Sequence, residues 1–222
     1  MKSQSLCLLG LVACASPAFA INIAGNAGFE TAGPTMTDSA QWQATGGGPV
    51  GTFSQRDSSN PFAGNWDHNL VAVGNAVAGA SAGIVQNSIA DAGFASLAPG
   101  STVSLSFEGR YNLGPGGVGF YALRILDSGG NIVADTGLQT ISSSTNGYFL
   151  FSSQALTVPA FGASPADAYA AFIEFDVAAG AFDGSFAQAY IDNVNVEATL
   201  VPAPATLALL GGSLLLGTRR RR

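Results

Sequence analysis

The sequence has 222 residues, with eight Lys plus Arg, 14 Asp plus Glu and one histidine, and its formal net charge is −6. All 14 acidic residues but only three basic ones, Arg56, Arg110 and Arg124, lie between residues 21 and 200, so this stretch has a formal charge of three minus 14, or −11. A chain this acidic repels phosphate backbones and anionic lipids, so no nucleic acid is expected as a partner. Both cysteines precede residue 21, so we expect neither a disulfide nor a thiolate metal site in the stretch.

The first 20 residues have the pattern of a secretory signal peptide. Lys2 supplies a positive charge, residues 6–12 (LCLLGLV) form an apolar run, and Ala18-Phe19-Ala20 places small residues at a cleavage site. The run is too short to span a bilayer, which takes about 20 apolar residues. We therefore predict cleavage after Ala20. One alternative stays open, because residues 11–14 (LVAC) also match a lipoprotein box that would place a lipid on Cys14.

Residues 21–200 contain short runs in which apolar and polar residues alternate, which is typical of half-buried strands. In one such run Val103, Leu105 and Phe107 are expected on the same face. Strands are expected at residues 52–56, 69–73, 83–89, 101–110, 119–127, 132–134, 147–158, 168–177 and 187–196. The turn residues at 127–131 (DSGGN) predict a hairpin. Because no helical pattern alternates with these strands, we predict an all-β antiparallel sandwich rather than a parallel sheet.

Three segments of this stretch resemble jelly-roll carbohydrate-binding modules. Residues 26–30 (NAGFE) are similar to the N-x-G-F-E opening of those modules, and residues 97–107 (LAPGSTVSLSF) are similar to their central turn and strand. Residues 190–196 (YIDNVNV) are similar to their closing strand. The segments come in the family's order and extend from end to end of the stretch. The resemblance implies a galactose-binding-like, jelly-roll β-sandwich over residues 21–200.

The same resemblance implies a structural calcium ion that joins the first and last strands, and the matching positions are Glu30 and Asp192. A hard cation prefers several carboxylate and carbonyl oxygens, and such a tie would stabilise a domain without disulfides. The alternative is that both carboxylates cap turns or lie in solvent.

Sugar binding needs aromatic rings exposed on a sheet face or a loop, with polar neighbours that bind hydroxyl groups. The candidates are Trp42, Trp66, His68, Tyr111 and Tyr121. Trp66 and His68 belong to the segment Trp-Asp-His-Asn, which is the densest polar and aromatic cluster of the chain. The alternative is that most of these rings fill the core, since buried rings supply much of a sandwich's apolar contact.

No enzyme is expected. Residues 79–83 (GASAG) match the G-x-S-x-G nucleophile elbow, but that motif requires a strand-turn-helix setting and a later histidine. The single histidine, His68, precedes Ser81, and it also excludes a zinc site with several histidines. A secreted glycan-active hydrolase with paired carboxylates stays open as an alternative, because 14 acidic residues offer many pairs.

The C-terminal residues 201–222 combine a proline motif, an apolar run and a basic cluster. The motif is Val201, Pro202, Ala203 and Pro204; residues 205–217 (ATLALLGGSLLLG) are uncharged; and the cluster is Arg219, Arg220, Arg221 and Arg222. Such arginines stay on the cytoplasmic side of a membrane, so we expect a single hydrophobic helix that anchors the chain in the inner membrane.

This tail resembles the PEP-CTERM sorting signal of Gram-negative bacteria, in which Pro-Glu-Pro precedes an apolar helix and an arginine cluster. The resemblance implies an exosortase-type membrane protease as a partner that recognises and removes the tail. Ala203 stands where the family usually has Glu, and an anchor that is never cut is the alternative.

Taken together, these patterns predict an exported, non-catalytic protein that is transiently anchored in the inner membrane and then displayed on the cell surface or released. The sorting resemblance implies a setting of exopolysaccharide and biofilm matrix, where the sandwich would bind an extracellular polysaccharide. A purely structural surface protein or adhesin without a small ligand is the alternative.

Overall fold

The structure is a computed structural model and describes residues 19–159 and 168–200. The expected signal peptide up to residue 18, the alternative lipid site at Cys14 and the expected sorting tail at residues 201–222 lie outside the described residues. In the two described ranges, no helix has the length and apolar character of a membrane span.

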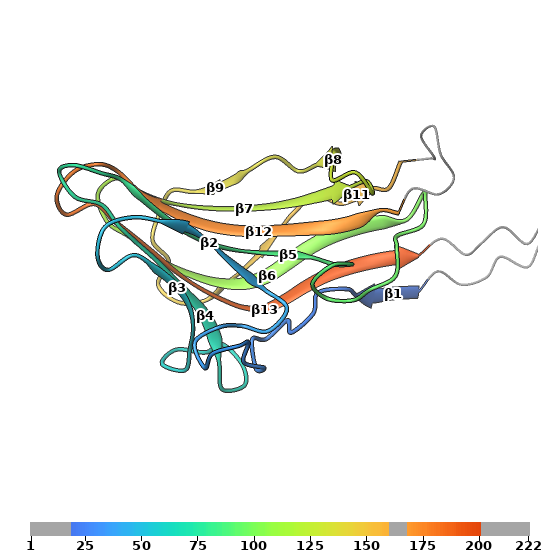
Figure 1. Ribbon diagram of the computed structural model, residues 1–222, viewed down its shortest axis with the longest axis horizontal. Coiled ribbons are helices and arrows are strands. Elements are labelled where there is room, and N and C mark those ends of the chain that lie inside the picture. The colour runs from blue at the N-terminus through green and yellow to red at the C-terminus, as the bar shows by residue number, and fades with distance from the viewer. Residues whose placement is uncertain (1–18, 160–167, 201–222) are drawn as a thin grey trace, which may run out of the picture. The chain divides into compact units, whose positions relative to one another are not determined.

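The described residues form two antiparallel sheets (Figure 1). The first sheet has, in spatial order, β10 (Phe149–Ser152), β6 (Thr102–Leu113), β13 (Phe186–Leu200), β4 (Asp67–Val73) and β3 (Phe53–Asp57), with β1 (Phe19–Asn22) beside β13 and β11 (Leu156–Thr157) beside β6. The second sheet has β2 (Gln43–Gly47), β5 (Ala80–Asn87), β12 (Ala170–Ala179), β7 (Gly117–Leu126) and β8 (Ile132–Asp135), with β9 (Gln139–Ile141) beside β7. The predicted all-β antiparallel sandwich is confirmed, and its topology is consistent with a jelly roll.

Alternation along the long strands decides which side chains enter the space between the sheets. In β6, Val103, Leu105 and Phe107 are buried while the residues between them are half-buried, as the sequence predicts. In β12, Ile173, Phe175 and the other odd-numbered side chains up to Ala179 are buried in the same way. The even-numbered side chains of β12 therefore lie on the outer face of the second sheet.

Aromatic rings form the centre of the core. Phe107 lies with its ring centroid 4.7 Å from that of Phe175, 5.1 Å from that of Tyr121 and 5.2 Å from that of Phe151. The first two contacts are edge-to-face and the third is stacked, which are the favoured geometries of aromatic pairs. Phe107 thus ties β6 to β7, β10 and β12.

Two details differ from the expected strands. Residues 147–158 form two strands, β10 and β11, instead of one, and the described residues include three strands that the sequence did not predict: β1, β2 and β9. All five residues of β2 are exposed, and the strand ends in Gly46 and Gly47, so no apolar alternation marks it. The hairpin at 127–131 is confirmed, because the Asp127 amide donates to the Asn131 carbonyl and β7 pairs with β8.

Candidate functional site

Glu30 and Asp192, the predicted metal ligands, lie at the two sides of one loop, residues 58–66, which joins β3 to β4. Glu30 Oε1 accepts hydrogen bonds from the amides of Asn65 (2.7 Å) and Trp66 (3.2 Å). Asp192 Oδ2 accepts hydrogen bonds from the amides of Phe62 and Ala63, both at 2.9 Å. The two carboxylates, one from the beginning and one from the end of the domain's sequence, therefore hold the same loop.

These contacts bear on the expected calcium ion. Calcium takes about six to eight oxygen ligands, whereas here the carboxylate oxygens face N–H donors. The described residues contain no group of three or more His, Cys, Asp or Glu side chains that could hold a metal ion. As arranged, the donor set fits backbone amides rather than a cation, so calcium binding would require the loop amides to move. Calcium stays a prediction.

Four of the five predicted ligand-binding side chains lie in the interior. Trp42 and Tyr121 are each 8% exposed, His68 is 3% exposed and Tyr111 is 1% exposed. Trp66 is half-buried, and the Arg56 guanidinium lies 3.7 Å from the centroid of its ring. The structure therefore uses Trp42, His68, Tyr111 and Tyr121 for packing, and of the five it leaves Trp66 with partial exposure. This is the alternative that the sequence left open, because the residue types alone do not say which face each ring occupies.

His68 lies between two serines, which raises the question of a catalytic arrangement. Ser39 Oγ is 2.8 Å from Nδ1, Ser54 Oγ is 2.9 Å from Nε2, and burial lowers the pKa of His68 to about 3. Ser54 donates its hydroxyl hydrogen to the carbonyl of Gly83, so it accepts from Nε2–H, and Nδ1 accepts from Ser39. His68 in this tautomer cannot take a proton from Ser54 as a general base would.

Ser81 of the G-x-S-x-G match lies within β5, and no helix follows it in the described part of the chain. The strand-turn-helix setting that the nucleophile elbow requires is therefore not formed at Ser81.

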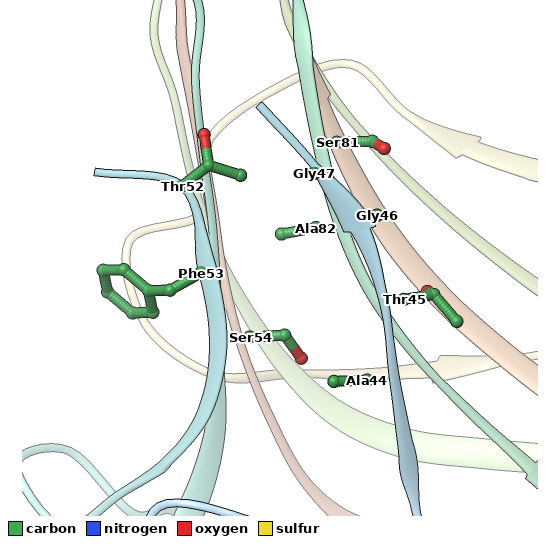
Figure 2. Close-up of a pocket in the computed structure, with 9 residues that line it drawn as sticks. All are labelled: Ala44, Thr45, Gly46, Gly47, Thr52, Phe53, Ser54, Ser81 and Ala82. Atoms are coloured by element: carbon green, nitrogen blue, oxygen red, sulfur yellow. The ribbon is translucent and has the colours of Figure 1, made fainter. Parts of the chain in front are cut away.

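A pocket of about 210 Å³ opens between the edge strands β2 and β3, above β5 (Figure 2). Its lining carries small side chains and hydroxyl groups, including those of Thr52, Ser54 and Ser81. A neighbouring pocket of about 150 Å³ shares Ala44 and Ser54 with it and reaches His68. Pockets that enclose drug-sized ligands measure about 300–1,000 Å³, so neither pocket encloses an oligosaccharide.

The outer face of the second sheet carries a row of side chains that crosses five strands. Register pairs Thr45 with Gly83, Gly83 with Asp176, Asp176 with Phe120, and Phe120 with Thr140. Residues paired in this way lie on the same face of a sheet. We call this surface the Asp176 face and define it by the row's side chains Thr45, Asp176 and Phe120 together with Phe172, Glu174 and Arg124.

Gly83 brings the hydroxyl of Thr45 and the carboxylate of Asp176 together. A Cβ at Gly83 would lie 2.6 Å from Thr45 Oγ1 and 2.9 Å from Asp176 Oδ1, so both side chains lean over the space where a side chain would be. Asp176 Oδ1 is buried and has no hydrogen-bond partner among the described residues. Burial, reinforced by the nearby Glu174 carboxylate, raises the pKa of Asp176 to about 6.

The rest of the Asp176 face combines apolar rings with one ion-pair network. The rings of Phe120 and Phe172 are half-buried and lie on the same side of the sheet as Asp176. Arg124 donates a hydrogen bond to Glu174, and its Nε lies 3.6 Å from Asp135 Oδ2. Chemically, the face combines carboxylates, the hydroxyl of Thr45 and apolar rings on one side of the sheet. In the sequence, the signal for this face is the pair of acids Glu174 and Asp176 inside an otherwise apolar strand.

No protein-family model matches the chain, and no curated protein is similar to it in sequence. Among solved structures, the enzymatically active domain of tailspike protein 4 of bacteriophage CBA120 is similar at a TM-score of 0.54 and 20% identity, over 79% of this chain and 21% of that chain. This chain thus spans about a fifth of the length of the tailspike chain, and at this identity the likeness shows the fold alone.

Carbohydrate-binding modules are also among the structural neighbours. TmCBM61, solved in complex with β-1,4-galactotriose, has a TM-score of 0.47 and 17% identity over 79% of this chain and 97% of its own. The CBM22-1 xylan-binding domain of Paenibacillus barcinonensis Xyn10C has a TM-score of 0.46 and 10% identity over 85% of this chain and 99% of its own.

Proposed function

We propose that this protein is an exported, non-catalytic, surface or matrix-associated protein that binds a polysaccharide on the Asp176 face. One observation carries the proposal: the buried, unpartnered oxygen of Asp176 lies in register between the hydroxyl of Thr45 and the ring of Phe120.

A sugar supplies the hydrogen-bond donor that the Asp176 face lacks. Its hydroxyl groups donate hydrogen bonds, and a buried acceptor without a donor costs free energy until it gains one. Its C–H faces pack against rings such as those of Phe120 and Phe172. An open sheet face lets an extended chain lie across several strands, which a pocket of about 210 Å³ does not. The galactotriose and xylan named for two structural neighbours agree with this ligand class, but the geometry of the face is the basis of the assignment.

Binding rather than hydrolysis is favoured by the placement of the acids. Glu174 and Asp176 leave β12 on the same side, next to each other, and Glu174 is paired with Arg124. Glycoside hydrolysis needs two carboxyl groups on opposite sides of the scissile bond. The acids of the Asp176 face do not oppose each other in this way.

The proposed protein is also exported and sorted by its two terminal segments. The signal pattern up to Ala20 and the tail at residues 201–222 support secretion, membrane anchoring by the tail and recognition by an exosortase-type protease. Intact mass of the protein recovered from its host would test both steps. A diacylglyceryl group on Cys14 would contradict simple cleavage after Ala20, and retention of Arg219 to Arg222 would contradict removal of the tail.

Binding is tested by titrating the purified full-length protein with neutral β-linked oligosaccharides in a calorimeter. We expect Asp176→Ala and Phe120→Ala to weaken binding about tenfold or more, in line with the roughly 1.4 kcal/mol that corresponds to a factor of ten. Gln55→Ala, on the outer face of the first sheet, is the matched control and should leave the affinity unchanged. Binding that survives both variants would place the site elsewhere. No binding to any glycan would favour the structural surface protein.

A further inference from the structure

The charge of residues 21–200 is almost entirely negative, because the three arginines among them are all engaged within the protein. Arg56 is buried and donates hydrogen bonds to three backbone carbonyls. Arg110 donates to an asparagine side chain, and its guanidinium carbon lies 5.1 Å from the centroid of a tyrosine ring. Arg124 is paired with two carboxylates. In the ranges that the structure describes, the acidic side chains therefore set the sign of the surface charge.

The same excess of acids is found on the side of the second sheet that carries the Asp176 face. Arg124 contacts Glu174 and Asp135, and Asp135 stands opposite it in register. Three carboxylates and one guanidinium give this side a formal charge of one minus three, or −2. Asp176 forms no ion pair among the described residues, and its Oδ1 has no hydrogen-bond partner there. Burial raises the pKa of Asp176 only to about 6, so its carboxylate is mostly ionised at neutral pH.

A carboxylate without a counter-ion distinguishes sugars by their charge. A sugar with a carboxylate or sulfate group brings a second negative charge and is repelled. A hydroxyl group donates a single hydrogen bond and brings no charge. An ammonium group donates charge-assisted hydrogen bonds, which are roughly twice as strong as neutral ones. The Asp176 face therefore favours a sugar with a free amino group over a neutral or N-acetylated sugar of the same backbone.

The side chains around Asp176 suit a small cationic group. A Cβ at Gly83 would lie 2.6 Å from Thr45 Oγ1 and 2.9 Å from Asp176 Oδ1, so the hydroxyl and the carboxylate come together over Gly83. An ammonium group has several hydrogens and can donate to both side chains at once. Phe120 stands opposite Asp176 in register and supplies a ring whose face attracts a cation and packs against the C–H groups of a sugar.

We propose that the polysaccharide bound on the Asp176 face carries free amino groups, as a hexosamine polymer without N-acetyl groups does. This inference rests on the proposed function and names the class of its ligand. Asp176 and Thr45 hold one ammonium group, and Phe120 contacts the sugar beside it. The formal charge of −11 over residues 21–200 attracts the rest of such a chain and accelerates its approach to the face.

Two oligosaccharides with the same backbone test this inference. A β-linked glucosamine oligomer and its fully N-acetylated counterpart are each titrated into the full-length protein in a calorimeter. We expect the oligomer with free amines to bind about tenfold more tightly in dilute salt, because its hydrogen bonds to the carboxylate are charge-assisted. The advantage should decrease as sodium chloride is added, since salt screens exposed charges.

Two variants assign the advantage to its site. Asp176→Asn keeps the shape of the side chain and removes its charge, so it should abolish the advantage of the oligomer with free amines. Glu197→Gln is the matched control, because it removes the charge of an exposed acid on β13 of the first sheet, and it should keep the advantage. If Asp176→Asn does not fold, Thr45→Val takes its place and should reduce the advantage through loss of the hydroxyl.

The results separate this inference from the proposed function. Equal affinity of the two oligomers, with both losing affinity in Asp176→Ala, supports glycan binding on the Asp176 face and overturns the preference for amines. An advantage that survives in Asp176→Asn, or is unchanged in Thr45→Val, arises from the charge of the whole chain and overturns the assignment to this site. Binding of neither oligomer overturns the inference, and the neutral oligosaccharides then decide the proposed function separately.

Discussion

Glu30 and Asp192 lie near opposite ends of the domain's sequence and accept hydrogen bonds from consecutive parts of one loop. Asp192 accepts the amides of Phe62 and Ala63, and Glu30 accepts those of Asn65 and Trp66. Gly64 lies between the two pairs with a positive φ of 67°, and a Cβ there would lie 2.0 Å from Glu30 Oε1. The loop follows a path that glycine permits and that two carboxylates stabilise.

This arrangement predicts that Asp192 stabilises the fold without any metal ion. Asp192→Ala leaves two loop amides without acceptors, and we expect it to reduce the free energy of unfolding by about 1–3 kcal/mol. Thermal unfolding in a chelator measures the effect. The same experiment with calcium tests the expected ion, because a ligand of the folded state alone raises stability in proportion to RT ln(1 + [L]/Kd). A calcium-dependent rise that disappears in both Asp192→Ala and Glu30→Ala would show that the loop amides give way to the ion.

Glycan affinity should depend on pH through Asp176. An ionised carboxylate accepts stronger hydrogen bonds than a neutral one, and the raised pKa of about 6 means that Asp176 loses its proton as pH increases through that value. We expect affinity to increase several-fold from pH 5 to pH 7 and to stay level above. Calorimetric titration at each pH measures this, and Asp176→Asn should flatten the profile. A wild-type profile without a step near pH 6 would show that the ligand does not contact this carboxylate.

Stability should depend on pH through Asp67 with the opposite sign to that of an ordinary paired carboxylate. Its pKa in the folded protein is raised from 3.8 to about 7, so between these values the folded state holds a proton that the unfolded state has released. Stability from this group therefore falls by roughly 1.4 kcal/mol per pH unit over that window and is constant above it. Denaturant unfolding from pH 4 to 8 measures this. The free energy of unfolding of Asp67→Asn should increase relative to that of the wild type up to about pH 7. An equal difference at every pH would contradict the raised pKa.

Two tyrosines in the same core should respond in opposite directions to loss of their hydroxyl groups. Tyr111 Oη is buried and has no hydrogen-bond partner in the described residues, so Tyr111→Phe should stabilise the protein by about 1 kcal/mol. Tyr121 donates to the carbonyl of Ser152 at 3.0 Å, so Tyr121→Phe should destabilise it by about 0.5–1.5 kcal/mol. Chemical denaturation of both variants compares them directly. Equal destabilisation would mean that the Tyr111 hydroxyl has a partner.

Much of the fold follows from local patterns. Alternation in β6 and the glycine turn after Asp127 are properties of neighbouring residues, so the strand and the hairpin can be predicted from the sequence. The exposed strand β2 cannot, because it is defined by pairing with β5 and not by its own apolar residues.

The candidate sites also divide into those that neighbouring residues reveal and those that depend on strand pairing. Glu30 and Asp192 could be singled out because each stands in a recognisable segment, and the structure brings them to one loop. The Asp176 face depends on the register that sets Thr45, Gly83 and Phe120 beside Asp176, and register is a long-range property. For Trp42 and Tyr111 the sequence left a binding surface and the core as alternatives, because ring type alone does not assign a face, and the structure places both rings in the core.

The pairing of β1 with β13 links the two ends of the folded domain. Ala20 lies opposite Thr199, one residue before the end of β13. Cleavage after Ala20 would remove Phe19 and Ala20 from this ladder and leave the backbone of Thr199 and Leu200 without its neighbour on that side. Thr199 would keep its pairing with Thr102 of β6, so the loss of Phe19 would leave Leu200 as the residue of β13 without a partner, directly before the Pro202–Pro204 motif.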